Sequence, residues 1–78
     1  MDTTEYVTKD LQEAGALLAC NAKILRLEKE SNYYLFVFDN KPLCEQLSNA
    51  FWAGELQVDA KALSTALKEL KDRLFSKG

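Results

Sequence analysis

The 78-residue sequence contains no histidine and only two cysteines, Cys20 and Cys44. Histidine is the usual general base beside a catalytic nucleophile, and two cysteines without a Cys-x-x-Cys spacing do not form a zinc motif. In a chain without a secretion signal, two cysteines are more often small buried hydrophobic side chains than a disulfide. The sequence therefore predicts no catalytic residue, no metal site and no cofactor.

Glycine, long apolar runs and basic charge are also scarce. The three glycines, Gly15, Gly54 and Gly78, are too scattered to form a phosphate-binding loop. No apolar run approaches the roughly 18 residues that span a membrane. The sequence also does not begin with the basic region and following apolar run that are typical of a secretory signal. The net charge is -2, which excludes the strong basic field of many nucleic-acid-binding proteins. We therefore expect a cytoplasmic protein that does not bind a membrane.

The clearest element is residues 33–39, which read Tyr-Tyr-Leu-Phe-Val-Phe-Asp. Aromatic and β-branched residues favour a strand, and the run lies between the turn residues Ser31-Asn32 and the breaker at Pro42. Side chains alternate between the two faces of a strand, and both faces of this one are apolar. We expect this central strand to be covered on both sides, either by helices or by a second copy of the chain.

The residues before this strand predict a helix and a partner strand. Residues 1–7 have no pattern and predict an irregular lead-in, and Thr8 is the expected N-cap of a helix that ends at Asn21. Gly15 lies within that helix and predicts a close approach of the helix to the sheet. Residues 22–30 predict a charged edge strand, with Leu25 and Leu27 on one side, that forms an antiparallel hairpin with the central strand.

The residues after the central strand predict two helices. Asn40 is the expected N-cap of the first, which has Pro42 in its first turn and ends at Gly54. Residues 55–58 alternate and predict a short extended piece or third edge strand, and Asp59 caps a last helix over residues 60–75. The fold class is therefore α+β in a single domain over residues 1–78. It has an antiparallel β-hairpin, with or without a short third strand, packed by three helices in the order α-β-β-α-(β)-α.

Two functional classes remain open. The first is a non-enzymatic interaction module that binds a protein partner or forms a homodimer, because Tyr and Trp are favoured anchors of interfaces. Its candidate surface comprises Tyr33, Tyr34 and Trp52. The alternative is a nucleic-acid-binding accessory protein, which needs basic side chains clustered away from Glu69 and Asp72. Its candidate contacts are Lys61, Lys68, Lys71, Arg73 and Lys77, and the nearby acids make nucleic acid the less favoured partner.

Short motifs between Thr8 and Phe75 carry a resemblance to other sequences. They are Asp10-Leu11, Glu13-Ala14, Leu17-Leu18-Ala19, the Phe-Val-Phe-Asp strand, Phe51-Trp52, Gly54-Glu55, Val58-Asp59-Ala60, Ala66-Leu67-Lys68 and Leu70-Lys71. Their order resembles a family of small uncharacterised domains from bacteria, archaea and their phages or mobile elements. Such sequences tend to have glycine after the first helix, where this chain has Asn21. The resemblance implies a prokaryotic or phage-related accessory protein, and it implies no substrate, cofactor or catalytic residue.

Overall fold

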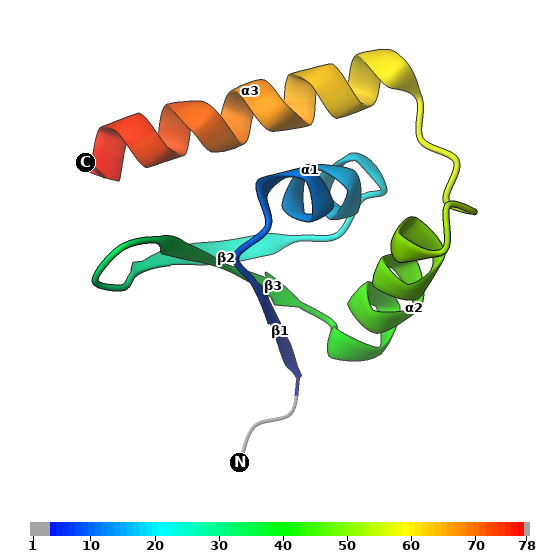
Figure 1. Cartoon of the computed structure of the whole chain (residues 1–78), viewed down its shortest axis with the longest axis horizontal. Coiled ribbons are helices and arrows are strands. Elements are labelled where there is room, and N and C mark those ends of the chain that lie inside the picture. Colours follow the sequence, from blue (N-terminus) through cyan, green and yellow to red (C-terminus); the bar gives the residue numbers. More distant parts are fainter. Residues whose placement is uncertain (1–3, 78) are drawn as a thin grey trace.

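A three-stranded antiparallel sheet and three helices form the structure, a computed structural model that describes residues 4–77 (Figure 1). In chain order the elements are β1 (Glu5–Thr8), α1 (Leu11–Ala19), β2 (Ile24–Lys29), β3 (Tyr34–Asp39), α2 (Lys41–Trp52) and α3 (Ala60–Lys77). The strand order is β1-β3-β2. The predicted α+β class, the antiparallel hairpin, the three helices and the central position of the aromatic strand are all confirmed.

The third strand comes from the N-terminal region and not from residues 55–58. β1 pairs antiparallel with β3, with Tyr6 opposite Phe38 and Thr8 opposite Phe36. The expected irregular lead-in is therefore wrong for residues 5–7, and residues 1–3 lie outside the described part of the chain. Residues 55–59 form an irregular connection to α3. The alternation of β1 was not evident because its buried Thr8 is polar.

Local signals set the helix boundaries. The N-cap of α1 is Asp10 and not Thr8: Asp10 Oδ1 accepts a hydrogen bond of 2.8 Å from the backbone N–H of Glu13, whereas Thr8 ends β1. Asn21 has a φ of 73° and provides the expected left-handed residue after the helix. Asn40 caps α2 as predicted, with a φ of 66°, and Gly54 follows that helix with a φ of 76°.

A β-bulge changes which side chains of β2 face the core. Ile24 is opposite Phe38, but Arg26 is opposite Val37, so Leu25 is an extra residue in β2. Ile24 and Leu27 consequently share the core-facing side, and Leu25 is exposed. The prediction that Leu25 and Leu27 share a side was wrong, because strict alternation does not include a bulge.

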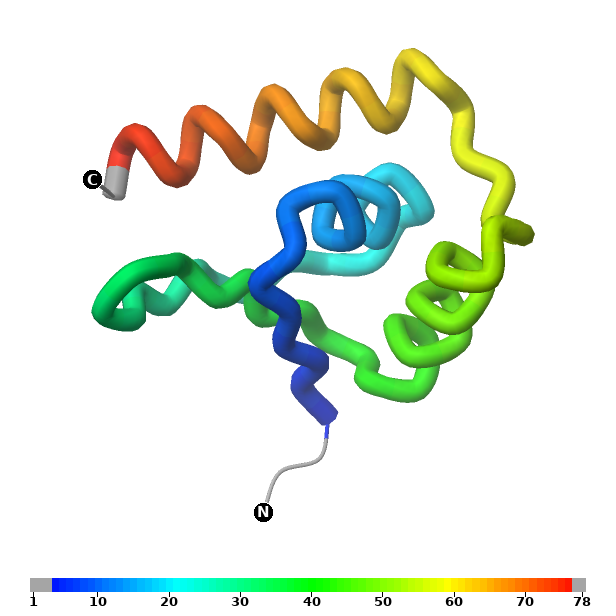
Figure 2. Tube along the Cα trace, in the orientation of Figure 1, coloured from blue at the N-terminus to red at the C-terminus, as the bar shows by residue number. Residues whose placement is uncertain are grey.

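All three helices pack on the side of the sheet that holds the two buried phenylalanines, Phe36 and Phe38. α1 lies between the sheet and α3, and α2 packs beside the end of the sheet (Figures 1 and 2). The core joins the phenylalanines to Leu17 of α1, Cys44 of α2 and Leu70 of α3. Gly15 was predicted to approach the sheet, but it approaches α3 instead. A Cβ atom built on it would lie 2.5 Å from Leu67 Cδ2.

Candidate interaction surface

The face of the sheet that points away from the helices carries the best candidate site. Alternation along the three strands places on it every side chain opposite in direction to Phe36 and Phe38. We call this the open sheet face, and it comprises Glu5, Val7, Leu25, Arg26, Glu28, Leu35, Val37 and Asp39. Lys23, Lys9 and Tyr33 lie at its ends. The expectation that helices cover both faces of β3 is wrong, because α1, α2 and α3 all contribute to the core on the other side of the sheet.

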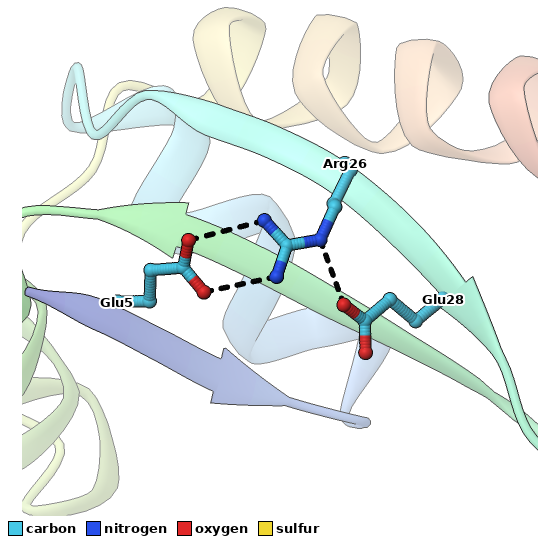
Figure 3. A network of polar contacts seen from close by, with 3 residues as sticks. All are labelled: Glu5, Arg26 and Glu28. Carbon is cyan, nitrogen blue, oxygen red and sulfur yellow. Dashed lines mark hydrogen bonds and ion pairs between the residues drawn. The ribbon is translucent and has the colours of Figure 1, made fainter. Parts of the chain in front are cut away.

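Three charged side chains span this face and form an ionic ladder (Figure 3). The two terminal nitrogens of Arg26 on β2 donate to both carboxylate oxygens of Glu5 on β1, at 2.9 and 3.1 Å. Arg26 Nε also donates to Glu28 at 2.7 Å. The hydrogen bond to Glu5 and then that to Glu28 raise the pKa of Arg26 above its ordinary value. Because Arg26 is opposite Val37 and Glu5 is opposite Asp39, the ladder crosses β3 between these two residues.

Apolar side chains form the middle of the open sheet face. Val7 is 47% exposed and Leu25 is 38% exposed, although both belong to a folded sheet. Val37 lies between them on the central strand and is fully buried. Its cover on this side comes from the neighbouring strands, including the Arg26 side chain that reaches across β3. The face therefore has an apolar centre between charged ends.

The structure separates the three aromatic residues of the predicted interaction surface. Tyr33 is 45% exposed at the β2–β3 turn, with the ammonium of Lys9 5.1 Å from its ring centre. Tyr34 belongs to the core-facing side of β3 and is half-buried. Trp52 is 63% exposed at the end of α2, edge-on to Phe51. The turn and α2 lie at opposite ends of the molecule (Figure 1), so these residues do not form one surface.

The basic residues proposed as nucleic-acid contacts are also divided. Their spacing places Lys61, Lys68 and Lys71 along one side of α3, but Lys68 forms an ion pair of 3.5 Å with Asp72. Arg73 pairs with Glu69 at 3.1 Å on another flank of the helix. The side chain of Lys77 lies outside the described residues. Nucleic-acid binding needs a basic cluster that Asp72 and Glu69 do not neutralise. Lys68 and Arg73 are paired with these two acids and therefore do not form such a cluster.

An open groove of about 490 Å³ separates α3 from β2. It is lined by Arg26, Leu27, Glu69, Asp72, Arg73 and Ser76. Both arginines already bind carboxylates, Arg26 in the ionic ladder and Arg73 through Glu69. No local sequence pattern indicates this groove, because its walls lie more than 40 residues apart in the chain. Its paired charges point to no particular ligand.

Sequence reasoning also missed a buried polar cluster that links β1, α1 and α2. Glu13 is only 4% exposed, and its two carboxylate oxygens accept hydrogen bonds of 2.7 Å from Tyr6 and Thr8. Tyr6 has one hydroxyl proton, so the Ser48 hydroxyl, 3.0 Å away, donates to the tyrosine oxygen. Burial and then the bond to Glu13 raise the pKa of Tyr6. Because every member is hydrogen-bonded and Thr8, Glu13 and Ser48 are buried, we interpret the cluster as a structural connection.

The part of the chain that the structure describes adds few chemical options. Within it, no group of three or more histidine, cysteine or acidic residues could hold a metal ion. None of the helices in the same residues is long and apolar enough to cross a membrane. Cys20 and Cys44 are free thiols, and burial is the main cause of the raised pKa of Cys44.

Comparison of the chain with family models, curated proteins and solved structures found no match. The resemblance to small prokaryotic and phage domains consequently remains a prediction.

Proposed function

We propose that this protein is a small non-enzymatic module that binds a protein partner through its open sheet face. One observation carries the proposal: all three helices contribute to the core on one side of the sheet, yet the other side has an apolar centre. An antiparallel sheet with one face in water usually alternates apolar and polar side chains. Here four residues of the open sheet face are apolar: Val7 and Leu25 are exposed, Leu35 is half-buried, and Val37 is covered by its neighbours.

The layout of this face resembles a protein interface. Such interfaces commonly have an apolar centre and a polar, charged rim. Val7 and Leu25 provide exposed apolar area on both sides of Val37, and the ionic ladder lies beside them. Charges in fixed positions select the orientation of a partner more than they add affinity. The proposal therefore assigns affinity to Val7 and Leu25, and selectivity to the charged residues.

The rival nucleic-acid function has less support. Lys68 and Arg73 are paired with carboxylates, and each pair reduces the positive potential that would attract phosphate.

The two free thiols fit a reducing compartment, and the proposal places the module in the cytoplasm.

The test is retention of proteins on the immobilised chain. The bait is the wild type, a Val7→Lys/Leu25→Lys variant, or Trp52→Ala as a matched control, each checked for folding by circular dichroism. The prey is an untagged copy of the chain and a lysate of the producing cell. The proposal predicts proteins that are retained by the wild type and the Trp52 variant and lost from the sheet-face variant. Equal retention by all three baits, or loss from the Trp52 variant alone, would contradict it.

A further inference from the structure

We infer that the occupant of the open sheet face is a second copy of this chain, packed face to face about a two-fold axis that crosses the strands at Val37. The inference rests on the proposed function and names its partner. Two sheets packed in this way lie about 10 Å apart with their strands inclined by about 30°. A two-fold axis makes the same surface serve on both copies, so the face must be complementary to itself.

The strand register divides the open sheet face into rows. Val7, Val37 and Arg26 form the central row, because each outer residue is opposite Val37. Glu5 and Asp39 form the row on one side. Lys23 joins that row, since its carbonyl accepts a hydrogen bond of 2.9 Å from the backbone N–H of Asp39.

The row on the other side of the centre has the opposite arrangement of charge. Leu35 is opposite Glu28 on β2. Lys9 follows Thr8, whose partner is Phe36, so Lys9 continues the register opposite Leu35. The ammonium of Lys9 lies over the ring of Tyr33, which confirms that this side chain reaches the hairpin end of the face.

A two-fold axis along the central row exchanges the two outer rows between the copies. Glu5 then faces Lys9 of the second copy, and Lys23 faces its Glu28. Val7 faces its own counterpart, which buries its exposed side chain, and the already buried Val37 lies at the centre of the contact. Arg26 also lies in the central row, but the carboxylates of its ladder neutralise it.

The charges on each face are balanced but unevenly placed. Three acids, Glu5, Glu28 and Asp39, oppose three bases, Lys9, Lys23 and Arg26. An axis parallel to the strands would place Asp39 on its own counterpart and Val7 on Arg26. The crosswise axis avoids both contacts. It places Arg26 on its own counterpart, where Glu5 and Glu28 neutralise each guanidinium.

Charge reversal with mixing tests this arrangement, with molar mass measured by sedimentation equilibrium. The wild type and the control Lys61→Glu, on α3, should be dimers. Lys9→Glu and Glu5→Lys should each weaken self-association on the order of tenfold, because like charges then meet at two symmetric contacts. A mixture of these two variants should restore the dimer, since Glu at position 9 then meets Lys at position 5.

A second pair, Lys23→Glu and Glu28→Lys, makes the same prediction and serves if Glu5→Lys does not fold. A dimer that tolerates the single reversals, or a mixture that stays monomeric, would overturn the inference. A monomeric wild type would overturn it too. In that case, a foreign protein retained by the wild type and lost from the sheet-face variant would still support the proposed function, whereas no such protein would contradict both.

Discussion

Replacement of Gly15 by alanine sets two opposing effects against each other. In an isolated helix the change would stabilise by about 1 kcal/mol, because alanine is a better helix former than glycine. In this fold the new Cβ would lie 2.5 Å from Leu67 Cδ2 and 3.0 Å from Leu67 Cγ. Overpacking of this kind costs about 1–3 kcal/mol. Leu67 is half-buried and gives way in part, so we take about 2 kcal/mol and expect a net loss near 1 kcal/mol.

The same substitution should have the opposite sign when Leu67 is alanine. The two atoms that crowd position 15 are then absent, and only the gain in helix propensity of about 1 kcal/mol remains. The coupling between positions 15 and 67 is therefore about 2 kcal/mol, within the range measured for residues in contact.

Urea denaturation of the four proteins in this double-mutant cycle, followed by circular dichroism, measures the coupling. The expected change of about 1 kcal/mol corresponds to about 4–8 °C in the melting temperature of a domain of this size. Gly15→Ala that stabilises the wild type, or that destabilises both backgrounds equally, would refute the close packing of α1 on α3.

Three further changes test local features. Tyr6→Phe should lower the free energy of unfolding by about 1.5–3 kcal/mol in urea titrations, because the buried Glu13 carboxylate loses the hydrogen bond that the Tyr6 hydroxyl donates to it. The raised pKa of Tyr6 means that its contribution is complete below the unfolded pKa, about 10, and falls as the pH rises through the folded value. Asn40→Ala should lower the free energy of unfolding by about 1–2 kcal/mol, measured by thermal denaturation, because the helix cap is lost and alanine disfavours a φ of 66°. Asn40→Gly should lower it by only a few tenths of a kcal/mol. A thiol reagent at neutral pH should label Cys20 before the buried Cys44, as followed by mass spectrometry.

Clear results would contradict each of these expectations. If Tyr6→Phe leaves the free energy of unfolding unchanged, the hydrogen bond from Tyr6 to Glu13 is absent in solution. If the free energy of unfolding depends on alkaline pH in the same way in the variant and the wild type, the pKa of Tyr6 is not raised. Equal effects of alanine and glycine at position 40 would remove the left-handed cap. Labelling of Cys44 at the rate of Cys20 would show that its site at the start of α2 is open.

Features with local causes could be predicted from the sequence. The central strand was recognisable because six apolar residues lie between turn signals, and Asn40 and Asp59 were recognisable as caps because each precedes a helical pattern. The left-handed conformation at Asn21 followed from the tolerance of asparagine for it. These features depend on a few neighbouring residues.

Features that depend on tertiary contacts could not be predicted. Thr8 is buried in β1 because it donates to Glu13, and a polar residue hides the alternation of a short strand. The bulge at Leu25 reverses the faces of the residues before it, and no local residue type marks it. The ladder joins Glu5 to Arg26, 21 positions along the chain, through a strand pairing that the sequence did not reveal.

Methyl NMR over a range of protein concentrations shows directly whether two copies of the chain associate through the open sheet face. The methyl resonances of Val7, Leu25 and Val37 should shift together as the concentration rises, while those of Leu63 on α3 stay constant. Shifts confined to residues around Trp52, or constant resonances for all three sheet-face residues, would contradict it.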